Sequence, residues 1–432
     1  MIIGMVMMMS FSLIDTFFVS LLGTEQLAAI SFTFPVTFTV ISLNIGLGIG
    51  TSAVIGKLHG RGESEEARFH ATGAMMVSVI LVGLLAVVGL LTIEPVFTLL
   101  NATSELLPYI SDYMCIWYIS SLFLALPMVG NSVLRACGDT RTPSIIMASG
   151  GFLNAALDPL LIFGWGPIPA MGIQGAAVAT LIAWSVGATW IIYLLAVKRQ
   201  LMLPRLLSVS ELLENSRDVM RIGFPAAGAN MMTPIAGGVM TAVVATYGAE
   251  AVAAWGVGHR LESIASIIIL SLSMTLPPFI SQNVGADKIR RVEHAYKMTL
   301  KFIMLWQLFI FALLWAMSGF IADIFAKEAE VASLITLFLA IVPLGYGLQG
   351  VIILTNSSFN AMHKPMTALV LSVIRLFVFF VPISYLGSVL YGLEGLFWGT
   401  VVANLLMGTL SYYWFSREIN DHHHDYEEMK GL

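Results

Sequence analysis

The sequence predicts an all-α integral membrane protein with twelve transmembrane helices, arranged as two six-helix lobes related by a pseudo-two-fold axis along the membrane normal. Three observations support this fold class. The 432-residue chain is 58% hydrophobic and only 11% charged, with a mean hydropathy of +0.87, whereas roughly a quarter of the residues of a soluble protein are charged. The apolar residues form long segments, and the two halves of the chain resemble each other.

Each apolar segment is long enough to cross a membrane as a helix. A hydrocarbon core of about 30 Å requires roughly 20 apolar residues, and a helix satisfies its backbone hydrogen bonds internally, as lipid demands. No strand-like alternation suggests a barrel. The expected spans are residues 1–22, 29–56, 70–100, 107–136, 143–164, 173–197, 219–247, 253–282, 294–325, 333–360, 365–387 and 394–416.

The basic residues predict the orientation of the spans, because Lys and Arg are enriched in cytoplasmic loops. They follow the even-numbered spans and are dense between residues 198 and 221, whereas the other side has Lys327 and very little else. We therefore expect both termini to be cytoplasmic.

A duplication relates the two halves of the chain. GTEQLAAIS from Gly23 matches GAEAVAAWG from Gly248, and the same offset recurs at other positions. Near the ends of the halves, GIQGAAVAT from Gly172 matches GLEGLFWGT from Gly392. Each half has an even number of spans, so the repeat is parallel. Repeats of this kind are typical of transporters whose substrate path lies between the halves.

The repeat also predicts the domain organisation. We expect an N-terminal lobe at 1–197, a cytoplasmic interlobe linker at 198–218, a C-terminal lobe at 219–416 and a cytoplasmic tail at 417–432. The basic and amphipathic character of the linker predicts a short helix on the membrane surface. The histidines of the tail indicate a solvated end of the chain rather than a metal site.

The N-terminal half alone has the two intramembrane carboxylates Asp15 and Asp158, which are not repeated at the equivalent positions of the C-terminal half. Asp15 in SLIDTFFVSLLG corresponds to Met240 in the repeat, and Asp158 of the fifth span also has an apolar counterpart. Asn154 lies four residues before Asp158, so the two share one helix face. Counted from the outer ends of their helices, both carboxylates lie roughly 10 Å below the outer boundary. At that common depth they could face each other.

Buried carboxylates of this kind need an explanation. Each costs about 2.5–3.5 kcal/mol at a helix centre, and ionisable groups within the membrane mark functional sites by default. Two facing carboxylates could share a proton, as in the relays of proton-driven carriers. The alternative is structural: Asp15 and Asp158 cap backbone groups or pair with a distant arginine.

Other side chains are candidates for the substrate path. Thioethers suit an adaptable apolar surface, and Met8, Met231 and Met232, together with Asn230, could line a cleft. Packing against lipid or core is an equally good interpretation of any single methionine. For Arg260 we expect a structural, lobe-locking role first and a gating or substrate role second.

Several chemistries are not indicated. There is no Walker motif, nucleophile elbow or paired-Asp metal motif, so we expect neither ATP hydrolysis nor any other enzymatic activity. We also expect no bound cofactor or metal site, only transported H+ or, as an alternative, Na+.

The chain resembles the MATE (multidrug and toxic compound extrusion) family, specifically its DinF-like, proton-coupled bacterial branch. The resemblance covers all twelve spans and rests on IDTFFVSLLG, GKLHGRG, NSVLRACGDTRTP, NAALDP and GIQGAAVAT. It implies a V-shaped pair of lobes that exports cationic or amphiphilic drugs by cation antiport. It also implies that Asp15, Asn131, Asn154 and Asp158 form a cation site in the N-terminal lobe, with Thr180 as the best candidate for a nearby threonine.

This resemblance completes the functional prediction. We expect a monomeric multidrug exporter of the bacterial inner membrane, with drugs and lipids but no nucleic acid as partners, driven by proton antiport at Asp15 and Asp158. Sodium coupling at the same site is the first alternative. A lipid-linked oligosaccharide flippase is less favoured, because it needs a basic cavity for pyrophosphate. Beyond Arg260 and Arg375, the spans offer almost no internal cations.

Overall fold

The computed structural model of the chain describes residues 2–100, 102–326 and 328–431. Within these ranges the side chains of residues 8, 9, 11–13, 16, 24, 27, 31, 249 and 422–431 lie outside the description. The chain divides into two compact units, Met1–Ala227 and Gly228–Leu432, which we call unit 1 and unit 2 and describe separately.

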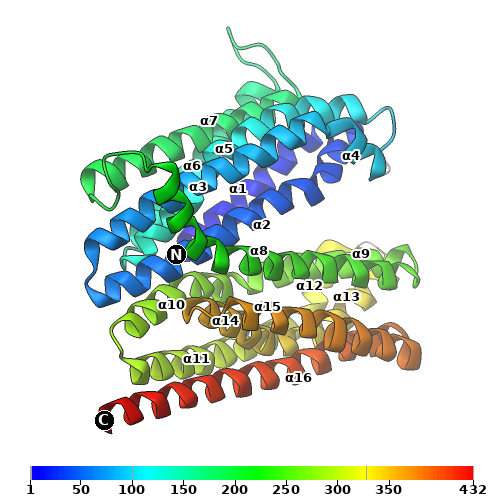
Figure 1. Cartoon of the computed structure of the whole chain (residues 1–432). Helices are drawn as coiled ribbons and strands as arrows, with labels where there is room; N and C mark the ends of the chain where they lie inside the picture. The colour runs from blue at the N-terminus through cyan, green and yellow to red at the C-terminus, as the bar shows by residue number, and fades with distance from the viewer. Residues whose placement is uncertain (1, 101, 327, 432) are drawn as a thin grey trace. The chain divides into compact units, whose positions relative to one another are not determined.

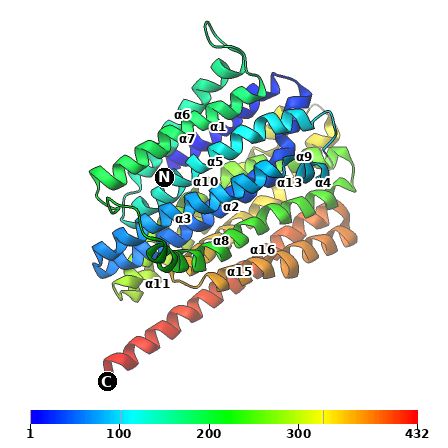
Figure 2. The ribbon, with the colours of Figure 1, turned by 45° about the horizontal axis from the view of Figure 1, so that its top comes forward.

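Unit 1 is built from long helices packed side by side (Figures 1 and 2). Its elements are α1 (Ile2–Ser20), α2 (Thr24–Arg61), α3 (Ser64–Leu91), α4 (Ile93–Leu99), α5 (Leu107–Ala136), α6 (Arg141–Ile162), α7 (Ile173–Tyr193), the π-helical turn η1 (Leu194–Lys198) and the first part of α8 (Val209–Ala245). α5 packs against α2, α3 and α7, and α1 packs against α6. The apolar core of one end of this unit includes Ile110, Met114 and Ile162.

Unit 2 repeats this pattern with more breaks in its helices. After the rest of α8 come α9 (Ala249–Ala265), α10 (Ile267–Gly285), α11 (Ile289–Ala316), α12 (Ser318–Phe325), α13 (Ala329–Ile341), the 3-10 turn η2 (Val342–Gly345), α14 (Tyr346–Ala361), α15 (Pro365–Ile374), the π-helical turn η3 (Arg375–Phe380) and α16 (Val381–Gly431). Tyr391 and Gly392 leave the helical conformation and divide α16 into two helices.

These helices confirm the predicted all-α membrane fold. Ten stretches of the described chain are long and apolar enough to cross a membrane. The last of them, Pro365–Asp421, contains two spans separated at Gly392. The first predicted span is α1, which supplies another 19 residues of apolar helix.

The backbone itself shows the duplication. Four pairs of equivalent positions share a positive φ, a conformation that is uncommon outside glycine. Gly23 and Gly248 have φ of 140° and 106° and precede α2 and α9, and Gly172 and Gly392 have φ of 57° and 65°. The remaining pairs are Gly62 with Asp287 and Gly138 with His363. The two halves therefore turn at the same places in the same way.

The segment between the halves differs from the predicted linker. The chain leaves the helical conformation at Arg199 and enters α8 at Val209, and α8 then continues without a break to Ala245. The prediction of a separate amphipathic helix is therefore wrong, because residues 209–218 form the first turns of the seventh span. The division between the units falls after Ala227, inside α8, rather than within 198–218.

A capping box explains why α8 begins where it does. The Ser208 backbone N–H donates to Glu211 Oε2 at 2.8 Å, and the Glu211 N–H donates to Ser208 Oγ at 3.4 Å. This reciprocal pair satisfies two N–H groups of the first turn. Arg205 adds two bonds to the Glu211 carboxylate, at 2.8 and 2.9 Å, so the start of α8 is tied to the segment before it.

Candidate functional site

Two carboxyl groups meet inside unit 1. α1 and α6 pack side by side, and the side chains of Asp15 and Asp158 lie within hydrogen-bonding distance of each other. Asp158 is fully buried. Neither of its oxygens, nor Oδ1 of Asp15, has a hydrogen-bond donor within the described chain. Ionised carboxylates only accept hydrogen bonds, so this contact becomes a bond when one of them is protonated.

The environment of the pair favours a shared proton or a bound cation. Two unit charges 4 Å apart repel by about 4 kcal/mol at an effective dielectric constant of 20. No Lys or Arg side chain pairs with Asp15 or Asp158 among the described residues. The structural alternative of an arginine partner is therefore not what unit 1 shows. A proton or a small cation would remove the repulsion.

Tyr113 completes this centre, and sequence reasoning missed it. It lies near the start of α5, is buried, and its hydroxyl interacts electrostatically with both carboxylates. A phenol can donate a hydrogen bond to one carboxylate and accept one from a protonated partner. With twelve tyrosines in the chain, no local pattern distinguishes this one.

The predicted polar neighbours divide into two groups. Asn154 Nδ2 donates to Thr180 Oγ1 at 3.3 Å, which joins α6 to α7 one turn from Asp158. Thr180 in turn donates to the carbonyl of Ala176 at 3.0 Å. Asn154 and Thr180 are therefore brought together beside the carboxylates, on the helix face that the spacing predicts.

Asn131, in contrast, lies far from the carboxyl pair. It is on α5, as Tyr113 is, but five turns further along the helix, which is about 27 Å at 1.5 Å per residue. It is buried, and its Oδ1 has no partner in the described part of the chain. The structure does not bring it to the site that the resemblance implies, because a matched motif carries residue type but not depth.

The proposed cleft residues are not gathered on one surface. Asn230, Met231 and Met232 are consecutive on α8 and half-buried. Neighbouring residues of a helix point about 100° apart, so the three cannot all face one cleft. Arg260 is exposed on α9, and the side chain of Met8 lies outside the described residues.

Unit 2 contains a charged centre of its own, around Glu262. His259 Nδ1 lies 2.9 Å from Glu262 Oε2, and Gln349 Nε2 donates to Glu262 Oε1 at 3.0 Å. Arg375 and Tyr346 are close enough to interact with the Glu262 carboxylate electrostatically. The arginine near Glu262 is thus Arg375, on η3, and not the sequence neighbour Arg260.

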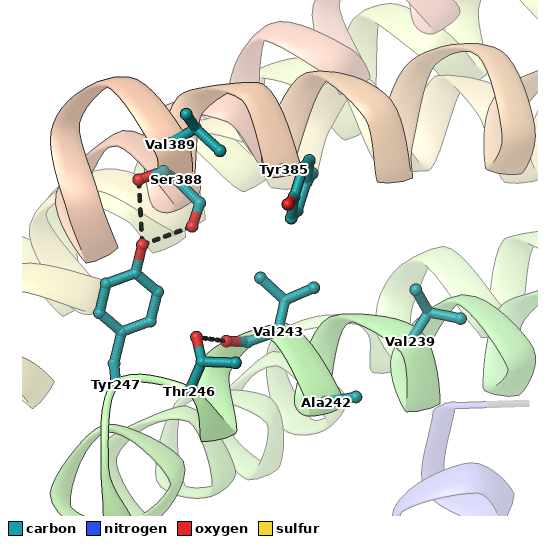
Figure 3. Close-up of a pocket in the computed structure, with 8 residues that line it drawn as sticks. All are labelled: Val239, Ala242, Val243, Thr246, Tyr247, Tyr385, Ser388 and Val389. Carbon is teal, nitrogen blue, oxygen red and sulfur yellow. Dashed lines mark hydrogen bonds between the residues drawn. The ribbon is translucent and has the colours of Figure 1, made fainter.

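A pocket of about 450 Å³ also lies within unit 2, between the end of α8 and α16 (Figure 3). Its lining is Val239, Ala242, Val243, Thr246, Tyr247, Tyr385, Ser388 and Val389. Tyr247 closes one side by donating to the Ser388 carbonyl at 3.0 Å. None of the predicted site residues lines it, and its lining has no carboxylate.

Known proteins place these features in a family. The family model MatE matches residues 1–160 and again residues 225–386, which are the two halves of the repeat. An "FAD transporter" from Shewanella oneidensis is 41% identical over 95% of this chain and 91% of its own length. A "Multidrug export protein MepA" from Staphylococcus saprophyticus is 25% identical over 94% of this chain and 89% of its own length.

Solved structures agree with this assignment. The Vibrio cholerae MATE transporter VcmN in its bent form superposes with a TM-score of 0.92 at 33% identity, covering 98% of this chain and 95% of that one. The match of both halves to the family model and the relative at 41% identity establish the family directly. The chain belongs to the MATE family, whose members are membrane transporters rather than enzymes.

Proposed function

We propose that this protein is a secondary active exporter of the bacterial inner membrane that couples proton entry to substrate export at Asp15 and Asp158. The observation that supports this proposal is the contact between these two carboxyl groups inside unit 1. They lie on α1 and α6, with Tyr113 beside them and no basic partner among the described residues. Two facing carboxyl groups without a basic partner suit a site that binds a proton and releases it again.

The coupling follows from the charge of the pair. A proton arriving from outside neutralises the pair and removes the charge repulsion between α1 and α6, which changes how these two helices pack. Release of the proton to the cytoplasm restores the charge and resets the site. About 2.3 kcal/mol is available per charge moved through 100 mV, and about 1.4 kcal/mol more per pH unit.

Two classes of substrate have support, and we propose a flavin dinucleotide first. The relative at 41% identity over nearly the whole chain is named an FAD transporter. The second class is the cationic or amphiphilic drugs expected from the sequence, supported by the multidrug export relative at 25% identity. The higher identity decides the order.

The two classes differ in how they respond to the membrane potential. Exchange of one proton for a monovalent cationic drug moves no net charge. Exchange of one proton for FAD, whose pyrophosphate bears two negative charges, moves three charges in the same electrical direction. At 100 mV this adds about 7 kcal/mol to the driving force, so FAD export responds strongly to the potential and drug export does not.

Sodium is the alternative coupling ion. Oxygens of Asp15, Asp158, Asn154 and Thr180 are the kind of hard ligands that a small cation takes. Sodium coupling differs from proton coupling only in the ion that neutralises the carboxyl pair. Transport measured under separate proton and sodium gradients distinguishes the two.

The test is transport into inverted vesicles under separate proton, sodium and potential gradients, with FAD and ethidium as probes. We expect proton-driven uptake that Asp158→Asn and Asp15→Asn each reduce strongly. Asp112→Asn, which removes an exposed carboxylate from α5, should leave uptake unchanged. Full uptake by both site variants would overturn the coupling proposal, and uptake that follows the sodium gradient alone would replace the proton by sodium. Uptake of ethidium without FAD would reverse the order of substrates.

A further inference from the structure

The charged centre of unit 2 contains more hydrogen-bond donors than acceptors. Its one carboxylate, Glu262, already accepts from Gln349 on Oε1 and contacts His259 on Oε2. Trp255 Nε1 is buried without a hydrogen-bond partner in the described chain, as are Tyr346 Oη and His259 Nε2. An indole N–H can only donate, and a buried donor without an acceptor costs about 1–3 kcal/mol.

These groups lie around one another rather than scattered through the unit. The rings of Trp255 and His259 are 4.5 Å apart between centroids, edge to face. Tyr346 and Arg375 both interact with Glu262 electrostatically. His259 on α9, Tyr346 on α14 and Arg375 on η3 thus all interact with Glu262, and Trp255 packs against His259.

Arg375 is the strongest of these donors, because its guanidinium is always charged. Its guanidinium makes no hydrogen bond and no ion pair with any described residue, although Glu262 is near it. It lies at the start of η3, within the eleventh span. π-helical turns inside helices occur frequently at functional sites, and a charged side chain within a span needs a partner.

The Asp15 and Asp158 centre of unit 1 has the opposite chemistry. The repeat matches Arg375 with Gly150 and Asp158 with Ile383, so neither centre is repeated in the other unit. The centre of unit 1 has acceptors without donors, whereas the centre of unit 2 has more donors than acceptors. A cation or proton satisfies the first arrangement, and an anion satisfies the second.

We propose that Arg375, Trp255 and Tyr346 form an anion-binding subsite within unit 2 that receives a phosphate group of the exported flavin dinucleotide. The proposal rests on the substrate proposed above. A guanidinium offers a planar fork that fits phosphate oxygens, and the indole N–H and phenol O–H add single donors. Glu262 is a positioning residue: its charge attracts the Arg375 guanidinium without pairing with it, and its own oxygens are occupied by His259 and Gln349.

Binding of FAD and riboflavin to the full-length protein in lipid nanodiscs tests the subsite. Riboflavin has the same ring system without phosphate, so wild type should bind FAD more tightly. Arg375→Gln should weaken FAD binding about 10–100-fold, as expected for loss of a charge-assisted contact, and leave riboflavin binding unchanged. Arg375→Lys keeps the charge without the fork and should lie between. Arg290→Gln, an exposed charge removed from α11, is the matched control.

Trp255→Phe provides a second variant in case Arg375→Gln does not fold, because it keeps an aromatic ring at this position and removes the indole N–H. It should weaken FAD but not riboflavin. Equal affinity of wild type for the two flavins, or FAD binding unaffected by both variants, would overturn the subsite. If vesicles transport FAD while the Arg375 and Trp255 variants bind it normally, the subsite fails and the proposed function stands. If wild type binds FAD through Arg375 but does not transport it, the proposed substrate fails and the subsite stands.

Discussion

The close contact between α2 and the first part of α8 gives a stability prediction that can be worked out from distances. A Cβ atom on Gly50 would lie 2.4 Å from the carbonyl oxygen of Val219, and one on Gly46 would lie 2.3 Å from that of Gly223. Gly46 and Gly50 are four residues apart and share a helix face. Such small residues let membrane helices approach closely. We predict that Gly50→Ala destabilises unit 1.

The size of the effect follows from the clash. Ordinary contact needs about 3.4 Å or more, so the two helices must separate by roughly 1 Å, and a backbone carbonyl cannot rotate away as a side chain can. Overpacking of this kind costs about 1–3 kcal/mol. Alanine is about 1 kcal/mol better than glycine within a helix, which offsets part of the cost. The net expectation is a loss of up to about 2 kcal/mol.

Thermal unfolding of the purified protein in detergent measures this loss. The matched control is Gly187→Ala in α7, where the added Cβ would lie 3.9 Å from Pro127 in ordinary contact. Gly50→Ala should lower the midpoint, and Gly187→Ala should leave it unchanged or raise it slightly. If Gly50→Ala is as stable as wild type, α2 and α8 do not approach this closely and the reasoning is refuted.

Three further predictions concern the site and the start of α8. Asp15→Asn combined with Asp158→Asn should transport no worse than either single variant, because the pair acts as a unit; additive losses in proton-driven uptake would show separate roles. Thr180→Val should weaken the affinity for the coupling ion about tenfold, because it removes one hydrogen bond. Thr180→Ser should retain the wild-type affinity. Equal ion affinities of the two variants would contradict this prediction. Hydrogen bonding by Arg205 and the α8 N-terminus lowers the pKa of Glu211 to about 2. The stabilising contribution of the Glu211 carboxylate is therefore complete above its usual pKa and is lost only as the pH falls through about 2. At neutral pH, Glu211→Gln should increase tryptic cleavage at Arg205. Unchanged cleavage would count against the ion pair between Arg205 and Glu211.

Much of the fold could be predicted because lipid imposes it. Twelve apolar segments follow from composition and length, and the repeat fixes their grouping. Gly23 and Gly248 occupy equivalent positions in the repeat, and both have a positive φ. The sequence motif that revealed the duplication therefore also marks a backbone turn that the two halves share. The start of α8 was harder, since its first turns are charged and look like a loop. Only the capping pair of Ser208 with Glu211 marks the helix start.

The site was only partly predictable. Asp15 and Asp158 were found because a charge in an apolar segment is costly and their repeat counterparts lack it. Tyr113 could not be found in this way, because a tyrosine is as common in packing as in function. The centre of unit 2 was missed for a different reason: Arg375 and Glu262 are far apart in sequence, and only the packing of η3 near α9 brings them together.

The opposite chemistry of the two units leads to a last prediction, about competition between proton and cargo. A cationic drug needs acceptors, and the one carboxylate of the unit 2 centre, Glu262, is already engaged. Under the proposed function, a drug cation would bind at Asp15 and Asp158 and compete there with the coupling proton. FAD bound through Arg375 would not compete. As the pH falls and the pair takes up a proton, ethidium affinity should fall. FAD affinity should hold, because the phosphodiester charges do not change near neutral pH. Measurement of both dissociation constants on wild type and on Asp158→Asn separates the cases, because the variant should lose the pH dependence of ethidium binding. A parallel fall in FAD affinity that Asp158→Asn abolishes would show that the two cargoes share the carboxylate site, and the division of labour between the units would have to be given up.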